Sequence, residues 1–111
     1  MKKMKRISFD FDNTLQNPDL KTLAKGFIED GHEVFIVTSR FPNLDNSDLF
    51  AVAKEVGIPV DNVVFSHVGS KILGITSYRI DVHFEDCPVE CAQLRPFCNV
   101  IQVEPFIIEE E

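Results

Sequence analysis

The apolar residues of this chain fall into short blocks, separated by stretches in which apolar positions recur three or four residues apart. The short apolar blocks predict strands at residues 6–11, 34–37, 62–65, 80–84 and 99–103. The stretches between them predict helices at residues 18–30, 46–56 and 88–94, while residues 70–77 are compatible with a short helix. Strands that alternate with helices imply right-handed crossovers and a mainly parallel sheet.

Capping signals support the two longest predicted helices. Asn17 suits the N-cap of the first helix, and Gly31 suits the position after its last turn. The second helix is expected to begin at Asn46 or Ser47 and to end at Gly57. These signals fix the lengths of the crossovers between the first three strands.

The length of 111 residues suits one domain with a core of its own. We therefore predict a single doubly wound α/β domain over residues 1–111, with a mainly parallel five-stranded sheet and helices on both faces. Ligands of such folds bind beyond the carboxyl ends of the strands, where the strand order reverses.

Charge and composition narrow the partners and the compartment. The net charge is −7, and a dense basic cluster lies at the amino end, at Lys2, Lys3, Lys5 and Arg6. The rest of the chain is strongly acidic and repels polyanions, which disfavours nucleic acid as a partner. No stretch approaches the ~20 apolar residues of a membrane span. With three cysteines, an odd number, the composition favours a reducing compartment, and we predict a cytoplasmic protein.

Polar side chains follow three of the predicted strands. The first strand runs into Asp10, Asp12 and Thr14. The second strand runs into Thr38, Ser39 and Arg40, and the fourth strand runs into two acids, Glu85 and Asp86. Several carboxylates at one edge repel one another, and a cation relieves that repulsion. Because this cluster offers oxygen and no sulfur, it favours Mg²⁺.

The spacing of Asp10 and Asp12 bears on chemistry. Residues two apart on an extended chain point the same way, so both carboxylates can face one ligand. With Asp10 as a metal-bound nucleophile, Asp12 lies about 6–7 Å further along, within reach of a leaving oxygen. An ordinary turn after a strand accounts equally well for residues 12–14 taken alone.

In their order along the chain, these segments resemble the four motifs of the haloacid-dehalogenase-like superfamily. Residues 9–15 (FDFDNTL) resemble its first motif, Asp-x-Asp-x-Thr after an apolar strand. Residues 34–38 resemble the second motif, Lys71 the third-motif lysine, and residues 80–86 the fourth motif, a strand that ends in an acidic pair. The resemblance implies a magnesium-dependent phosphatase, because the Asp two residues after the nucleophile is typical of the phosphatases and phosphomutases in this superfamily.

The resemblance also implies a role for each matching residue. Asp10 would attack phosphorus and form an aspartyl-phosphate, and Asp12 would act as general acid and base. Magnesium would be held by the Asp10 carboxylate, the Asp12 backbone carbonyl and Asp86. Phosphate oxygens would be bound by Thr38, Ser39 and Lys71. Glu85 stands where many members have Asp, and it is expected to contact the ligands rather than the metal.

Two cations near these motifs are expected to play no part in the reaction. Lys54 suits the polar face of the second helix, and Arg40 is expected to be a solvated loop residue rather than a substrate contact.

The intervals between the motifs leave no room for the cap domain that covers the site in most members of this superfamily. Capless members act on macromolecules or exposed phosphates, or use a neighbouring subunit as a lid. Residues 81–86 resemble the same segment of small nucleotidase-like members, which implies a nucleotide as substrate. The expected substrate is therefore a nucleotide or a macromolecular phosphate, and a homo-oligomer is a possible source of the lid.

Two other readings compete with the phosphatase. One is a binding or regulatory module that keeps this fold without turnover. The other is a receiver-like phospho-aspartate switch. That reading is weak, because residues 65–67, after the third strand, carry no carboxylate.

Overall fold

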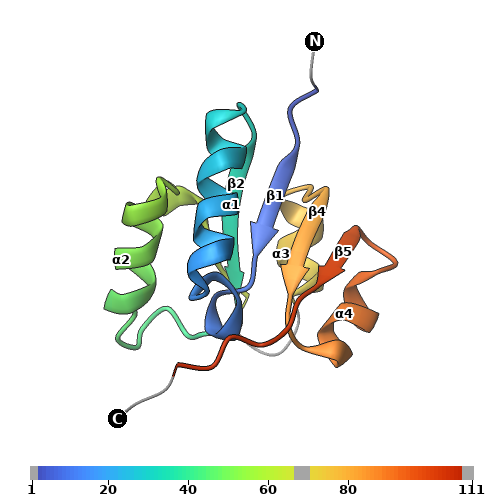
Figure 1. Ribbon diagram of the computed structural model, residues 1–111. Coiled ribbons are helices and arrows are strands. Elements are labelled where there is room, and N and C mark those ends of the chain that lie inside the picture. Colours follow the sequence, from blue (N-terminus) through green and yellow to red (C-terminus); the bar gives the residue numbers. More distant parts are fainter. Residues whose placement is uncertain (1–2, 67–70, 109–111) are drawn as a thin grey trace.

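A computed structural model gives the structure of residues 3–66 and 71–108. Lys2 and Ser70, which entered the interpretation of the sequence, lie outside the described residues. Within the described residues, five strands pair into one sheet in the order β3-β2-β1-β4-β5, and every pairing is parallel (Figure 1). The strands are β1 (Arg6–Phe9), β2 (Glu33–Thr38), β3 (Val63–Phe65), β4 (Val82–Glu85) and β5 (Asn99–Gln102). The predicted sheet is confirmed, and no strand of this part of the chain runs antiparallel.

The connections between the strands are helical. They are the turn η1 (Phe11–Leu15), α1 (Pro18–Glu29), α2 (Ser47–Val56), η2 (Val60–Asn62), α3 (Ile72–Ser77) and α4 (Pro88–Leu94). The Asn17 side chain caps α1 by accepting a hydrogen bond from the Asp19 backbone N–H, as its sequence predicts. Gly57 ends α2 with a φ of 99°, a left-handed conformation that glycine adopts at no steric cost.

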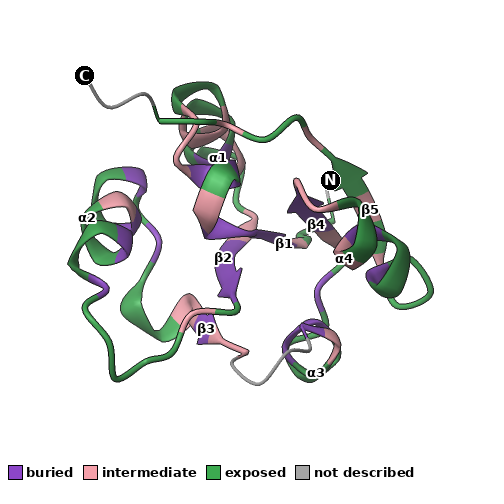
Figure 2. Ribbon diagram, turned by 90° about the horizontal axis from the view of Figure 1, so that it is seen from below, coloured by how far each residue is buried: buried purple, intermediate pink, exposed green. Residues whose placement is uncertain are grey.

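The two faces of the sheet carry separate apolar clusters. Along β2, Val34 and Ile36 pack with residues of α1 and α2, whereas Phe35 and Val37 pack with α3 and α4. This alternation follows from the period of two along a strand that is covered on both sides. Figure 2 shows α1 and α2 on one side of the sheet and α3 and α4 on the other. Helices on both faces are thus confirmed.

Two strand ends differ from the apolar pattern. The pattern extends the first strand to Phe11, but β1 ends at Phe9, and the Asp10 N–H still donates to the Phe84 carbonyl at 2.9 Å. The pattern starts the fourth strand at Ile80, but β4 begins at Val82, because the chain is still turning at Arg79, where φ is 53°. In both places apolar residues are buried outside the ladder, which periodicity alone cannot distinguish from strand.

None of the helices described here is long and apolar enough to cross a membrane. The cytoplasmic compartment stays a prediction.

Candidate active site

Three acidic side chains meet where the neighbouring strands β1 and β4 end. Phe9 pairs with Phe84 in the parallel register, so the residues that follow them, Asp10 and Glu85, lie side by side. One carboxylate oxygen from each of Asp10, Glu85 and Asp86 lies within 4.8 Å of the others. Asp10 is 6% exposed and Glu85 is fully buried. A buried cluster of like charges needs cationic partners.

Lys71 supplies one positive charge from the residue before α3. Its Nζ donates to Asp10 Oδ1 at 2.7 Å and to Glu85 Oε1 at 2.8 Å, and it is ion-paired with Glu90 Oε1 at 3.2 Å. The ammonium group has three N–H donors, and these three carboxylates surround it. Lys71 is 4% exposed, so it binds the acids out of contact with solvent.

Lys71 bridges two acids, Asp10 and Glu85, and their surroundings shift the two pKa values in opposite directions. Burial raises the pKa of Asp10 to about 8, although Lys71 pulls that pKa down. Burial also acts to raise the pKa of Glu85, but hydrogen bonds from His83 and Lys71 prevail and lower it to about 2. For Lys71, burial opposes the charge, yet the Asp10 and Glu85 carboxylates raise its pKa above the ordinary value. Without a second cation, Asp10 is therefore the carboxylate that is hardest to ionise.

Glu85 is held from inside the sheet by a buried chain of polar groups. Ser8 and His83 face each other in the β1–β4 register, and Ser8 Oγ lies 2.6 Å from His83 Nδ1. His83 Nε2 lies 3.0 Å from Glu85 Oε1. Burial lowers the pKa of His83, so the ring is neutral, and its Nε2–H donates a hydrogen bond to the ionised Glu85. These hydrogen bonds fix the Glu85 carboxylate, which in turn holds Lys71.

Thr14 orients Asp86 toward Asp10. Its hydroxyl lies 3.0 Å from Asp86 Oδ1 and 3.4 Å from Asp10 Oδ2, and the side chain is fully buried. A hydroxyl has one proton to give, so the shorter contact with Asp86 is the stronger hydrogen bond.

Asp12 lies apart from this cluster and is bound by Arg40. Arg40 Nε and Nη2 reach the two Asp12 oxygens at 3.0 and 2.7 Å, and Nη1 and Nη2 reach Asp48 at 2.7 and 2.9 Å. The guanidinium carbon also lies 4.8 Å from the centre of the Phe11 ring. The expectation of a solvated Arg40 is wrong, because two carboxylates and a ring fix its position.

The predicted phosphate ligands on β2 lie near the same edge of the sheet. Thr38 is the last residue of β2 and is buried, and its Oγ1 accepts a hydrogen bond from the Arg40 backbone N–H at 3.2 Å. Ser39 follows it and is exposed. The structure thus joins Asp10, Lys71, Glu85 and Asp86 by contact, and it leaves Asp12 in η1, Thr38 at the end of β2 and Ser39 just after it outside that cluster.

The carboxyl-terminal segment, residues 103–108, forms hydrogen bonds with both the end of β4 and the turn η1. The Val103 N–H donates to the Glu85 carbonyl at 2.9 Å. Asn13 Nδ2 donates to the Phe106 carbonyl at 2.8 Å, and the Phe106 N–H donates to the Asn13 carbonyl at 2.7 Å. In Figure 1 this segment runs from β5 below the sheet toward the start of α1. A reading of local patterns missed this contact, because Asn13 and Phe106 are 93 residues apart.

Asn13 has a φ of 62°, which asparagine tolerates and most other residues do not. We expect Asn13→Ala to lower the free energy of unfolding by about 1–2 kcal/mol, because it strains the backbone and removes one hydrogen bond. Asn13→Gly relieves the strain and should cost less. Urea unfolding of both variants measures the difference. Equal losses of unfolding free energy in the two variants would show that backbone strain at residue 13 does not cause the loss.

The donor set suits a hard divalent cation. Asp10 Oδ2 and Asp86 Oδ1 both contact the Thr14 hydroxyl, and one oxygen of each acid lies within 4.8 Å of the other. Oxygen ligands of this kind are those that Mg²⁺ takes. Glu85 belongs to the same acidic group, but Lys71 and His83 already occupy its Oε1. Asp10 and Asp86 are therefore the better ligands, and Glu85 contacts the groups around them.

A scan against models of known protein families finds no match for this chain. A search of curated proteins finds none either. The case for a function therefore rests on the site itself.

Proposed function

We propose that the protein is a magnesium-dependent phosphatase that hydrolyses phosphomonoesters through an aspartyl-phosphate on Asp10. The observation that carries this proposal is the setting of Asp10, which is buried between the ammonium of Lys71 and the carboxylate of Asp86. The resemblance of the four motifs to the haloacid-dehalogenase-like superfamily agrees with it. Among the described residues, η1 and α1 lie between β1 and β2, and α2, η2, β3 and α3 lie between β2 and β4. In this proposal neither interval holds a cap domain.

In the proposed reaction an Asp10 carboxylate oxygen attacks phosphorus and forms the acyl phosphate, while the bond to the substrate alkoxide breaks. Asp12 gives its proton to the departing oxygen and is left ionised. Asp12 then takes a proton from water, whose oxygen attacks the acyl phosphate. Inorganic phosphate leaves, and Asp10 returns as a carboxylate.

Magnesium would be held by the Asp10 carboxylate, the Asp12 backbone carbonyl and Asp86, and it would neutralise charge between protein and phosphate. Lys71 binds a phosphate oxygen through the N–H that now faces Glu90, its longest contact at 3.2 Å. Thr38 and Ser39 supply hydroxyl and backbone donors from the end of β2. Glu85, fixed by His83, keeps Lys71 against Asp10.

An open site limits the substrates. Without a cap, this chain cannot enclose a small molecule on its own. The substrate is therefore an exposed phosphate of a macromolecule, or a nucleotide that a second subunit covers as a lid; the nucleotide is suggested by the resemblance of residues 81–86 to nucleotidase-like members.

One contact favours a second candidate, a non-catalytic binding or regulatory module. Arg40 engages both oxygens of Asp12, so neither oxygen is free to face a leaving group. A general acid has to contact the oxygen that leaves, so Arg40 must release Asp12 for turnover. Were it not released, the site would bind phosphate and magnesium without hydrolysis.

Hydrolysis of aryl phosphates, nucleotides, sugar phosphates, oligonucleotide ends and phosphopeptides, with magnesium and with EDTA, tests the proposal. Magnesium-dependent release of phosphate is expected from at least one class. After an acid quench, mass spectrometry should find phosphate on the peptide that contains Asp10. Binding of magnesium without any turnover would support the module instead.

Asp86→Asn is expected to raise the magnesium concentration for half-maximal activity by at least about tenfold, because a hard cation prefers carboxylate to amide oxygen. Titration of activity with MgCl₂ measures this. Asp61→Asn is the matched control, since it removes the same charge at an exposed position outside the acidic cluster. An unchanged requirement in Asp86→Asn would reject Asp86 as a ligand.

A further inference from the structure

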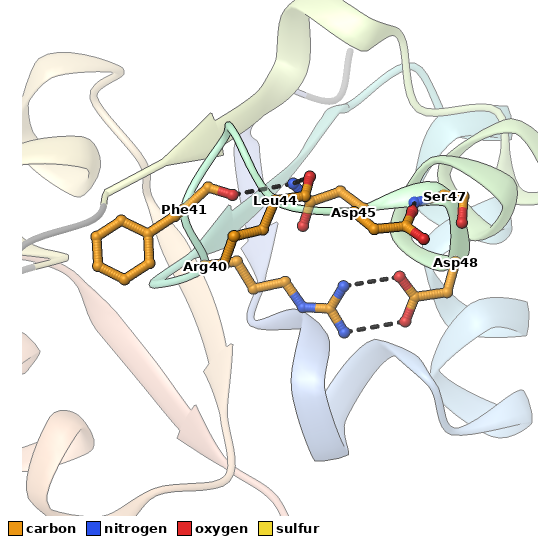
Figure 3. A pocket seen from close by; sticks show the side chains of 7 residues that line it. Arg40, Phe41, Leu44, Asp45, Ser47 and Asp48 are labelled. Carbon is orange, nitrogen blue, oxygen red and sulfur yellow. Dashed lines mark hydrogen bonds and ion pairs between the residues drawn. The ribbon is translucent and has the colours of Figure 1, made fainter.

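A pocket of about 470 Å³ opens between the end of β2 and the start of α2, and we call it the β2–α2 pocket. Arg40, Leu44, Asn46 and Asp48 are among the residues that line it. Figure 3 shows the Arg40 guanidinium facing the Asp48 carboxylate on one side, whereas the Phe41 ring points away from this pair. None of the roles proposed above for phosphate or magnesium uses this pocket.

Arg40 joins the pocket to the proposed chemistry. The same guanidinium that lines the pocket binds both oxygens of Asp12. In the proposed reaction Asp12 faces the oxygen that leaves phosphorus. The group attached to that oxygen therefore extends from Asp12 toward Arg40 and the β2–α2 pocket.

The charges around the pocket select what can occupy it. Asp12 is protonated when it acts as the acid, so Asp48 balances the single charge of Arg40, and the exposed, ionised carboxylate of Asp45 leaves the pocket with a net negative charge. An anionic group in the pocket is repelled, and a cation or an N–H donor is attracted. Leu44, whose side chain is largely exposed, adds an apolar wall.

Asn46 fixes the loop that lines the pocket. Its Nδ2 donates to the Phe41 and Leu44 carbonyls at 3.0 Å each, so both amide protons are engaged. Its Oδ1 is buried and is not open to a ligand. The acceptors that a ligand can reach are therefore the exposed carboxylates of Asp45 and Asp48, and together with the apolar wall they are complementary to an organic group that carries N–H donors.

We propose that the β2–α2 pocket binds the alcohol part of the substrate and selects phosphomonoesters whose alcohol part is cationic or an uncharged N–H donor. Esters with a second anionic group at this position are rejected. This inference rests on the proposed function, because the proton that Asp12 gives to the leaving oxygen locates the alcohol part. A nucleoside monophosphate fits the pocket, whereas a nucleic-acid end brings a second phosphate to it.

Three aryl phosphates with nearly equal leaving groups test the selection, namely the O-phosphates of tyramine, para-ethylphenol and phloretic acid. They carry an ammonium, an apolar and a carboxylate tail on the same type of phenol. We expect kcat/KM with magnesium at low ionic strength to fall in that order, by about tenfold from first to last. Added salt should reduce this ratio, because the carboxylates are open to solvent.

Asp45→Asn tests the origin of the ratio, because Asp45 is placed in neither metal nor phosphate binding. We expect it to bring the tyramine-to-phloretate ratio down to about threefold, chiefly by lowering kcat/KM for the tyramine ester. Asp61→Asn, the matched control, should leave the ratio unchanged. Calorimetry with Asp10→Asn, which is not expected to turn the esters over, measures binding of the same three probes.

The possible outcomes separate the two proposals. Equal kcat/KM for the three esters, or a ratio that Asp45→Asn does not change, overturns the pocket's role and leaves the phosphatase standing. Turnover of none of them, and of no class in the substrate panel above, overturns the phosphatase, and a tyramine preference in calorimetry then supports the pocket as a binding site only. Absence of both turnover and preference overturns both.

Discussion

Asp10→Asn is expected to lower kcat for any phosphomonoester by at least about a thousandfold, an effect on the order of 4 kcal/mol on the barrier. An amide oxygen is a poor nucleophile and carries no charge for magnesium, so both proposed roles of Asp10 disappear at once. Asparagine has nearly the shape of aspartate, and the neighbouring Lys71 keeps Glu85 and Glu90 as partners. The fold should therefore persist, which circular dichroism would verify.

The same substitution is expected to stabilise the metal-free protein above pH 4. The pKa of Asp10 is about 8 in the folded state, against an ordinary value of 3.8. Between these values the unfolded chain loses the proton and the folded protein keeps it, so wild-type stability falls as pH rises. The free energy of unfolding falls by at most about 1.4 kcal/mol per pH unit. The Asp10→Asn variant lacks this dependence, because asparagine does not titrate.

Urea unfolding of the wild type and of Asp10→Asn, in EDTA at about pH 4, 6 and 8, measures the difference in stability. The gain in stability of Asp10→Asn should be small at the lowest pH and largest at the highest. Magnesium should reduce the gain, since it favours the ionised carboxylate of the wild type. Full activity in Asp10→Asn would reject the mechanism, and a gain that does not depend on pH would reject the buried, hard-to-ionise Asp10.

The meeting of Asp10, Glu85 and Asp86 follows from features that the sequence displays. Apolar runs locate the strands, parallel strands present their carboxyl ends at one edge, and the acids come directly after two of these runs. What the sequence could not supply was the strand order, which places β1 next to β4. That adjacency turns two separate acidic segments into one cluster.

Other parts of the site depend on contacts that no local pattern encodes. Ser8 and His83 each interrupt an apolar strand, which was a visible signal, but only the β1–β4 register reveals that they face each other. Arg40 was misread because the conformation of its loop, and not its position after a strand, brings Asp48 within reach. Lys71 comes next to Asp10 through the start of α3, whereas Lys54 is exposed on α2, as expected.

Lys71→Met is expected to lower the free energy of unfolding by about 3–5 kcal/mol at pH 7, a loss typical of removing one partner from a buried ion pair. Methionine has a similar length, but it leaves Asp10 and Glu85 buried without their shared ammonium. Without magnesium, Asp10 is already largely protonated at pH 7, because its pKa is about 8. The charge left without its cation is therefore that of Glu85, which keeps the hydrogen bond from His83.

Urea unfolding of the wild type, Lys71→Met and the exposed control Lys54→Met measures this loss. The control should lie within about 0.5 kcal/mol of the wild type. The double variant Lys71→Met/Glu85→Gln should recover a part of the stability, because it removes the charge left uncompensated. If the double variant were as unstable as Lys71→Met, the loss would come from packing around the lysine stem. Lys71 would then not stabilise the folded protein by compensating the buried charge of Glu85.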